Sequence, residues 1–588
     1  MDSKHVTEST SGQEDIQKTW WKEAIIYQIY PRSFQDSDGD GIGDLNGITF
    51  RLDYIQSLGV DIIWLNPIFL SPNDDNGYDI SDYREIMREF GTMEDFDRLL
   101  KEIHKREMRL VLDLVVNHTS DEHPWFEEAR KSRHNPYYNY YHWWPAEKGE
   151  PPLRLSYFDE EGNAWTYNKP TDSYYLHYFS RKQPDLNWEN PEVRQEIFDM
   201  MRFWFDKGID GFRMDSISLI AKDPSFPLID SKKYPDIFSF YAKEPRLHLY
   251  LHEMNRQVLS KYDCMSVGEG SAVMVDDVAK FVDPAREELN MLYHFDAARI
   301  RNTTLPDNPE SGIDYSLIAL KKMFTEWDKA VDKGWPSIYL GNHDQPRMVS
   351  RFGSDKDEFR ALSAKMLITF LLTMRGTPYW FAGDEIGMRN IRFDHIEDYN
   401  DIDTINRYKK AKAEGKDPQA VLDEQKETGR DNARTPFQWD RSPEAGFTAG
   451  TPWLKVNPDY TWINVADEEK DPTSILNYFK KVVSFRKENP SLIYGSYHLL
   501  DAENPQSYTF LRKTGADTYL IMLNFSPKAA ISTPGIDMSN AHVLLDNYGD
   551  RSHMAPQKDI TLRPFEAIVF QLNHPVYESF IDSLDLLE

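Results

Sequence analysis

Apolar residues along the chain fall into eight short, nearly continuous runs. The runs occupy residues 23–31, 61–69, 109–117, 208–215, 264–270, 289–295, 337–344 and 378–387. Unbroken apolar character is typical of parallel strands that are buried on both faces. Segments with helical spacing of apolar residues, such as 93–108 and 193–208, lie between the runs. The alternation predicts an α/β fold, a (β/α)8 TIM barrel with eight strands.

Two stretches interrupt this alternation and a third follows it. Residues 118–183, after the third strand, are rich in aromatic residues and proline, and about 388–460 follow the eighth strand. From residue 496 onward, short alternating runs with turns predict an all-β sandwich domain. The predicted parts are a polar N-terminal tail, the barrel, an inserted domain B and a C-terminal β-domain: 1–19, 20–117 with 184–495, 118–183, and 496–588.

Composition narrows the classes of partner. The formal net charge is −29, which argues against nucleic acid or an anionic membrane surface as a partner and otherwise serves solubility. No apolar run reaches the ~18 residues of a transmembrane helix. The N-terminus lacks the apolar core of a signal peptide, so we expect a cytoplasmic protein, or a periplasmic or secreted one if a signal was removed. The single cysteine, Cys264, excludes an internal disulfide bond.

Four of the predicted strand ends carry an acidic residue. These are Asp113 in DLVVNH, Asp215 in GFRMD, Glu269 in VGEG and Asp344 in NHDQ. The carboxyl ends of barrel strands meet at one face, where TIM-barrel active sites lie. Two opposed carboxyl groups are what the cleavage of a glycosidic bond requires. The pattern therefore predicts a glycoside-cleaving site at this face.

The order and wording of these four segments resemble glycoside hydrolase family 13, the α-amylase family. The branch resembled is that of the α-glucosidases, oligo-1,6-glucosidases and sucrose isomerases. The resemblance implies that Asp215 is the nucleophile, Glu269 the general acid and Asp344 the acid that grips the sugar 2-OH and 3-OH. Arg213 shares a strand face with Asp215 and is expected to keep that carboxylate ionised. We expect the surroundings of Glu269 to raise its pKa.

The same resemblance implies a set of substrate contacts. Asp75 would pair with Arg434 and hold the 4-OH and 6-OH of a terminal sugar, so that only a chain end fits. Tyr78 would stack on the sugar ring, and the matched histidines would bind its hydroxyl groups. Asp113 and Asn117 are either scaffold or contacts, and the two phenylalanines either line the pocket or pack in a core. The further matched positions are His118, Phe158, Phe179, Gln183, Ser216 and His343.

The loop DSDGDGIGD, residues 36–44, places acids at alternate positions with glycines between them. Carboxylate and carbonyl oxygens are ligands that Ca²⁺ prefers. The resembled branch has a structural Ca²⁺ site here, and the matched ligands are Asp36, Asp38, Asp40, the Ile42 carbonyl and Asp44. The alternative is a solvated acidic turn.

Three activities compete within the branch. In the family, valine after the nucleophile goes with α-1,6 links, whereas alanine or threonine goes with α-1,4 links or sucrose; here the residue is Ser216. Sucrose isomerases carry a phenylalanine pair around the leaving sugar, and the matching positions are Ser271 and His294. We therefore expect an exo-acting retaining α-glucosidase for maltose-type oligosaccharides or disaccharides, acting as a monomer. The alternatives are an oligo-1,6-glucosidase and a sucrose isomerase.

Overall fold

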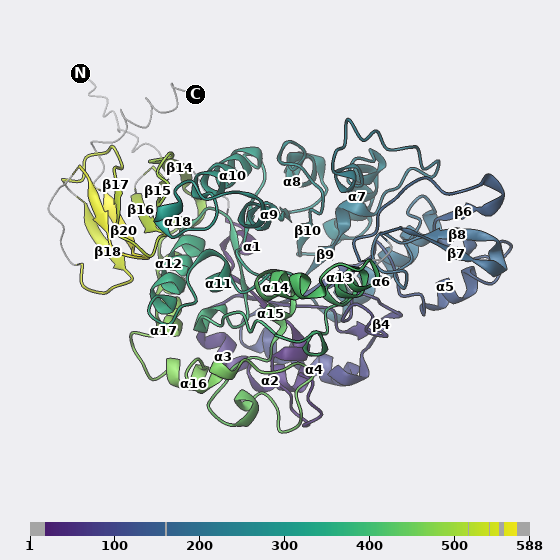
Figure 1. Ribbon diagram of the computed structural model, residues 1–588, viewed down its shortest axis with the longest axis horizontal. Helices are drawn as coiled ribbons and strands as arrows, with labels where there is room; N and C mark the ends of the chain where they lie inside the picture. Colours follow the sequence, from purple (N-terminus) through teal and green to yellow (C-terminus); the bar gives the residue numbers. More distant parts are fainter. Residues whose placement is uncertain (1–17, 159–161, 516, 540, 552–557, 573–588) are drawn as a thin grey trace, which may run out of the picture.

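The computed structural model describes residues 18–158, 162–515, 517–539, 541–551 and 558–572 (Figure 1). All but two residues of the predicted N-terminal tail lie outside these ranges. Eight parallel strands form the central sheet, one in each predicted run. They are β1 (Ile26–Ile29), β2 (Ile62–Leu65), β5 (Arg109–Val115), β9 (Gly211–Asp215), β10 (Met265–Glu269), β11 (Met291–Tyr293), β12 (Ser337–Ile338) and β13 (Thr377–Phe381).

The strand order is that of a barrel. Hydrogen-bonded neighbours run β11-β10-β9-β5-β2-β1-β13-β12, so each strand lies beside its predecessor in the chain. The ends of this order, β11 and β12, meet where the Ser337 hydroxyl donates to the Leu292 carbonyl at 2.9 Å. The predicted (β/α)8 barrel is confirmed. Because all eight strands are parallel, their carboxyl ends share one face.

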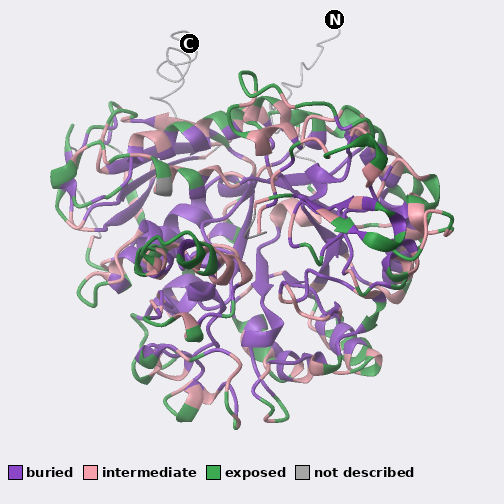
Figure 2. Cartoon of the chain, turned by 45° about the vertical axis from the view of Figure 1, so that its right-hand side comes forward, coloured by how far each residue is buried: buried purple, intermediate pink, exposed green. Residues whose placement is uncertain are grey.

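Local signals explain where the surrounding helices begin and end. Thr92 and Asp95 form a capping box at the start of α4 (Met93–Lys105), which satisfies the free amides of a first helical turn. Asn190 caps α6 (Pro191–Lys207), and Gly208 ends it with φ of 109°. The other long barrel helices are α7 (Arg246–Gln257), α10 (Leu317–Ala330), α12 (Arg360–Thr373) and α17 (Ile475–Glu488). Buried residues concentrate in the strands and the helix faces against them (Figure 2).

Three further parts are attached to the barrel. Within 118–183, β6 (Trp143–Pro145), β8 (Ser173–Leu176) and β7 (Trp165–Asn168) form an antiparallel sheet. After β13 the chain forms α13 (Ile402–Ala413), α14 (Pro418–Thr428) and the single turn α15 (Asp431–Arg434). The C-terminal part pairs β14 (Ser496–Leu500), β15 (Ser507–Lys513), β16 (Thr518–Asn524), β20 (Ala567–Leu572) and β18 (His542–Asp546), with β17 (Ala530–Ser532) and β19 (Ile560–Leu562) as a second sheet.

In Figure 1 the inserted part after β5 lies opposite the C-terminal sheets, and helices α13 and α14 lie between them. Both parts follow the carboxyl end of a barrel strand, β5 or β13. Among the described residues, no helix is both long and apolar enough to span a membrane.

Candidate active site

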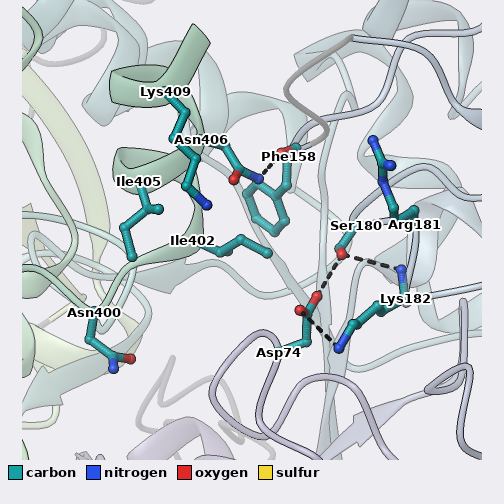
Figure 3. Close-up of a pocket in the computed structure, with 10 residues that line it drawn as sticks. All are labelled: Asp74, Phe158, Ser180, Arg181, Lys182, Asn400, Ile402, Ile405, Asn406 and Lys409. Atoms are coloured by element: carbon teal, nitrogen blue, oxygen red, sulfur yellow. Dashed lines mark hydrogen bonds and ion pairs between the residues drawn. The ribbon is translucent and has the colours of Figure 1, made fainter. Parts of the chain in front are cut away.

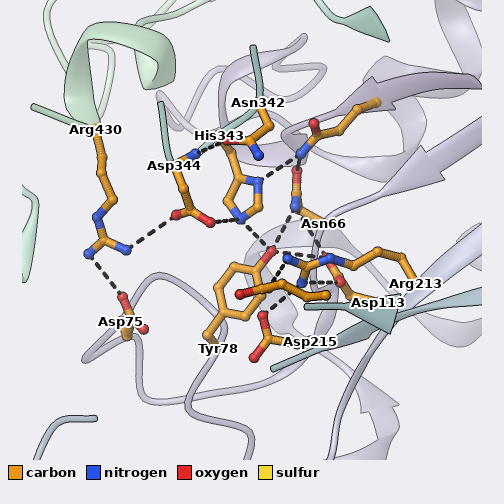
Figure 4. Close-up of polar contacts among 12 residues, drawn as sticks. Asn66, Asp75, Tyr78, Asp113, Arg213, Asp215, Asn342, His343, Asp344 and Arg430 are labelled. Carbon is orange, nitrogen blue, oxygen red and sulfur yellow. Dashed lines mark hydrogen bonds and ion pairs between the residues drawn. The ribbon is translucent and has the colours of Figure 1, made fainter. Parts of the chain in front are cut away.

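The guanidinium of Arg213 is the centre of the site (Figure 4). Its Nη1 lies 2.7 Å from carboxylate oxygens of both Asp113 and Asp215. Its Nη2 contacts Glu269, and its Nε donates to the Tyr293 hydroxyl at 2.8 Å. Arg213 is fully buried. One desolvated cation therefore holds three carboxyl groups together, and such buried charges persist only when they are paired.

The two central carboxyl groups differ in proton affinity. Burial raises the pKa of Glu269 to about 8 although Arg213 opposes it, so this side chain is a neutral acid at pH 7. Burial also raises the pKa of Asp215, but only to about 6, because Arg213 and a hydrogen bond with Glu269 stabilise its charge. The raised pKa of Glu269 confirms the sequence-based expectation. Asp215 remains mostly ionised, although its pKa lies above rather than below the ordinary value.

Asp344 differs from these two acids because its pKa is lowered rather than raised. Burial alone would raise its pKa, but the positive charges of Arg430 and Arg434 beside it lower it well below the ordinary range. Its carboxylate lies 3.1 Å from His343 Nε2, 3.3 Å from Arg430 and 3.1 Å from Arg434. Asp344 is thus a permanent anion at the end of the seventh barrel strand segment. A fixed negative charge of this kind suits a site where positive charge develops on a sugar.

The predicted pair of Asp75 with Arg434 is wrong. Asp75 instead pairs with Arg430, at 3.4 Å (Figure 4). Arg434 donates through Nε to the His343 carbonyl at 2.9 Å and through Nη2 to Asp344. The two arginines lie four positions apart across the single turn α15, so both side chains reach the same region and only their exact placement separates them.

Tyr78, His343 and Asp113 form a connected wall. The Tyr78 hydroxyl donates to Asp113 at 2.9 Å and lies 2.6 Å from His343 Nε2. The rings of Tyr78 and His343 are stacked. Burial lowers the pKa of His343 to about 3, so its imidazole is neutral. Asp113 also accepts from Trp64 and Asn66 and is 1% exposed. Its four donors favour the scaffold role for Asp113 over direct contact with a sugar.

Asn117, His118 and Gln183 belong to a second layer. The side-chain oxygen of Asn117, Oδ1, accepts from Lys222 Nζ at 2.6 Å, and its side-chain nitrogen, Nδ2, contacts His118 Nδ1. His118 Nε2 lies 3.0 Å from the Tyr78 carbonyl, and Gln183 Nε2 donates to Asp75 at 3.2 Å. Burial lowers the pKa of His118 to about 3. Asn117 is therefore scaffold, while Gln183 orients the Asp75 carboxylate.

Phe158 and Phe179 line the side formed by the inserted part. Their ring centroids are 5.5 Å apart, and the Arg430 guanidinium lies 4.8 Å from the centre of the Phe158 ring. Phe158 also borders a pocket of about 370 Å³ between the 180–182 loop and helix α13 (Figure 3). Both phenylalanines are only partly buried. Phe158 therefore lies at this pocket, whereas Phe179 packs against a hydrophobic cluster of the inserted part.

Ser216 and Ser271 follow the two central carboxyl groups. Ser216 has φ of 43° and ψ of 31°, the left-handed region that costs β-branched residues most. Ser271 donates from its hydroxyl to Glu269 Oε1 at 2.7 Å. Glu269 Oε2 faces the donors Arg213 and Tyr293. Both oxygens of Glu269 therefore have hydrogen-bond partners, Ser271 at Oε1 and Arg213 with Tyr293 at Oε2.

The acidic loop brings three of its predicted metal ligands together. Carboxylate oxygens of Asp36, Asp38 and Asp40 lie within 4.8 Å of one another. Asp44 lies outside this group of three, and its two oxygens accept from the amides of Ser37 and Gly47, each at 2.7 Å. This caps α2 (Leu45–Phe50). Three converging carboxylates are a donor set that fits a hard divalent cation.

Several site residues were not predicted from the sequence. Tyr293 is the last residue of the sixth strand, β11. A search of the strand ends for hydroxyl groups as well as acids would have found it. Arg430 directly precedes the segment that carries Arg434 and was not singled out. Asn66 donates to the Tyr78 hydroxyl at 2.8 Å, and no local signal in the chain marks it.

Comparison with known proteins agrees with this geometry. The family described as alpha amylase, catalytic domain, matches residues 28–495. An oligo-1,6-glucosidase of Parageobacillus thermoglucosidasius is 51% identical over 571 residues, covering 95% of this chain and 100% of that protein. An alpha-glucosidase of Pediococcus pentosaceus is 43% identical and covers 94% of this chain and 99% of its own. The isomaltulose synthase SmuA of Protaminobacter rubrum superposes with a TM-score of 0.89 at 43% identity, covering 95% and 100% of the two chains.

The chain belongs to the alpha-amylase family and is a glycoside hydrolase. The resemblance inferred from the four acidic segments is confirmed. The relatives also include the predicted branch, with both α-glucosidases and a sucrose-isomerising enzyme among them.

Proposed function

We propose that this protein is an exo-acting, retaining α-glucosidase that releases glucose from the non-reducing end of short α-glucosides. One observation carries the proposal: a single buried arginine holds Asp215 and Glu269 in contact, with the first ionised and the second protonated. Retaining glycosidases need such a close pair, whereas inverting ones keep the carboxyl groups further apart to admit water.

The reaction would proceed in two steps. Asp215 attacks the anomeric carbon and forms a glycosyl ester, while Glu269 donates its proton to the departing glycosidic oxygen. A water molecule then gives a proton to the Glu269 carboxylate and attacks the anomeric carbon, which frees Asp215. Asp344, a permanent anion, would stabilise the positive charge of both transition states.

The exo action rests on the closed end of the pocket. Asp75 and Arg430 form an ion pair there, and Gln183 fixes the second oxygen of Asp75. Carboxylate and guanidinium together can accept from and donate to the 4-OH and 6-OH of one sugar. A further sugar attached at the 4-OH or 6-OH would collide with Asp75 and Arg430. The expected substrate is therefore the non-reducing end of a chain.

Proton NMR during hydrolysis tests the proposal. A retaining exo-enzyme releases α-glucose first from maltose or isomaltose, before mutarotation. Initial release of the β-anomer, or no glucose from maltose, isomaltose, sucrose or trehalose, would contradict it.

A second candidate is an oligo-1,6-glucosidase. It is favoured by the most similar relatives reported above, one of which carries that name at 51% identity. Ser216 favours the α-1,4 activity, because a small polar residue beside the nucleophile leaves room for the leaving sugar. The ratio of kcat/KM for isomaltose and maltose separates the two candidates.

Ser216→Val tests whether this residue sets the ratio. A packing change of this kind is worth roughly 1–3 kcal/mol, so the isomaltose to maltose ratio should rise about tenfold or more. Ser216→Ala controls for the loss of the hydroxyl group and should leave the ratio unchanged. Because residue 216 has positive φ, the Tm of the valine variant reports the strain that a β-branched residue adds there. An unmoved ratio in a folded valine variant would remove Ser216 as the selector.

Sucrose isomerisation has less support. That reaction requires a fructose held beside the glycosyl enzyme while water is excluded. Ser271 is small, and His294 stacks on Trp327 with centroids 3.7 Å apart. Its ring is therefore engaged with a helix residue of the barrel. We expect hydrolysis products to dominate when sucrose is supplied.

We also propose a structural Ca²⁺ at the loop of residues 36–44. Asp36, Asp38 and Asp40 would hold it, with the Ile42 carbonyl and Asp44 as the other candidate ligands. A cation bound only to the folded state stabilises it by mass action, by about 2.7 kcal/mol at 100 times Kd. Chelation should therefore lower Tm, and Ca²⁺ but not Na⁺ should restore it. An unchanged Tm in chelator, together with no bound metal by elemental analysis, would overturn the proposal.

A further inference from the structure

Asp401 is a fully buried acid at the start of the helical insertion after β13. One of its oxygens, Oδ2, accepts from the amide and hydroxyl of Thr404 at 3.1 and 2.8 Å, and so caps α13. The other, Oδ1, accepts from Arg430 Nε at 2.7 Å and lies 2.5 Å from Arg430 Nη2. Asp401 therefore has two separable roles, one toward its own helix and one toward an arginine of the active site.

Asp401 is the closest of three acids around Arg430. Asp75 and Asp344 lie 3.4 and 3.3 Å from the same guanidinium. Those two acids belong to the proposed sugar-binding site, whereas Asp401 contacts the guanidinium from the insertion. The shortest contact, made to two guanidinium nitrogens, thus comes from a residue outside that proposed site.

The insertion that carries Asp401 is itself fixed in place. The amides of Asn400 and Asp401 donate to Asp431 Oδ2 at 2.7 and 2.9 Å. Farther along α13, the side-chain nitrogen of Asn406 donates to the backbone carbonyl of Phe158 at 2.7 Å. This bond links α13 to the inserted part beside the pocket shown in Figure 3. Asp401 is therefore held from both ends, as a positioning group must be.

We propose that Asp401 is a positioning residue that orients Arg430 and thereby sets the selectivity for an unsubstituted terminal glucosyl unit. The inference rests on the proposed function, in which Asp75 and Arg430 hold the 4-OH and 6-OH. It assigns part of the exo specificity to the insertion after β13, not to the strand ends. A site built around hydrogen bonds to a hydroxyl group discriminates strongly against a substrate that lacks it.

Asp401→Asn separates the two roles of the residue. Asparagine caps helices as well as aspartate does, so α13 keeps its cap while Arg430 loses its closest anion. Asp401→Ser, which also caps, is the second variant in case the amide perturbs folding. The matched control is Asp403→Asn, which removes one charge from the same helix. Asp403 is partly exposed, pairs with Arg407 at 4.0 Å and acts on Arg430 through space, without the short contact that Asp401 makes.

The measurement is kcat/KM on 4-nitrophenyl α-glucoside and on the α-xyloside, which lacks the 6-CH2OH group. We expect Asp401→Asn and Asp401→Ser to lower the glucoside to xyloside ratio by about tenfold, chiefly through KM for the glucoside. Asp403→Asn should leave the ratio within twofold. If Asp401 had only a structural role, its substitution would lower kcat/KM equally for both substrates and leave the ratio unchanged.

Arg430→Gln distinguishes the two possible failures. If it lowers the ratio but the Asp401 variants do not, Asp401 is only a helix cap and the positioning role is wrong. If Arg430→Gln itself leaves the ratio unchanged, the proposed grip on the terminal sugar is wrong as well. Equal losses in the Asp401 and Asp403 variants would also overturn the inference, because they would indicate a general effect of charge.

Discussion

Among the regions of this protein that bury arginines completely, two satisfy them in different ways. Arg213, in the active site, contacts three carboxyl groups. Arg512, at the junction of the barrel with the C-terminal sheets, contacts the carbonyls of Thr373, Leu492, Ile493 and Gly495. Arg486 does the same with the carbonyls of Leu372, Met374, Gly376 and Leu492.

The difference lies in what the partners can do. A carboxyl group can take or release a proton, and its affinity responds to the arginine beside it. A backbone carbonyl only accepts hydrogen bonds. Several of the carbonyls belong to the last turns of α12 and α18 (Ser491–Tyr494), where helices leave acceptors unpaired and attract cations. The first region is therefore suited to chemistry and the second to holding two domains together.

The pKa directions agree with this division. Arg213 has its pKa raised well above the ordinary value in spite of its burial, because acids surround it. Burial lowers the pKa of Arg486 to about 9, since no carboxylate opposes the desolvation. Substitutions in the first region should consequently change rates, and substitutions in the second should change stability.

Asp215→Asn should produce the largest loss of activity. The amide cannot attack the anomeric carbon, so kcat should fall by about 10⁴-fold or more on every α-glucoside. Arg213 keeps Asp113 and Glu269 as partners, so Tm should change little. Retention of a tenth of the wild-type kcat in the purified variant would show that Asp215 is not the nucleophile.

Glu269→Gln should produce a smaller and selective loss. Protonation of the leaving group contributes roughly 10²–10⁴-fold on maltose. A nitrophenyl glucoside has a good leaving group and should lose much less in the bond-breaking step. Pre-steady-state rates on both substrates check this expectation, and equal losses would count against Glu269 as the general acid.

Arg486→Met should leave kcat unchanged and reduce stability. The carbonyls of Leu372, Met374 and Gly376 would lose this donor, while that of Leu492 keeps Arg512. One unsatisfied buried group alone costs about 1–3 kcal/mol. The matched control is Lys481→Met, which removes an exposed cation from the same helix and should leave Tm unchanged. If the Arg486 variant matched the control in Tm, or lost activity at a temperature where it stays folded, the division between the regions would fail.

The sequence predicted most of the first region and none of the second. The strand runs and their terminal acids are local patterns, so the barrel and Asp215, Glu269 and Asp344 could be placed in advance. The sequence could not show whether Arg430 or Arg434 pairs with Asp75. The two arginines lie one helical turn apart, and only the folded structure shows which guanidinium lies next to that acid. In the sequence, Arg486 looks like an ordinary arginine near the end of a helix. Most of the carbonyls that it contacts come from distant segments, so no local pattern predicts them.

The pH dependence of kcat/KM on maltose, whose leaving sugar needs a proton, tests the central claim most directly, that burial keeps Glu269 protonated beside an ionised Asp215. Glu269 must carry its proton, so activity should fall as the pH rises through about 8. Asp215 must be ionised, so activity should also fall as the pH drops through about 6. In Glu269→Gln the alkaline fall should disappear while the acid fall remains. An alkaline fall that persists unchanged in this variant would contradict the account.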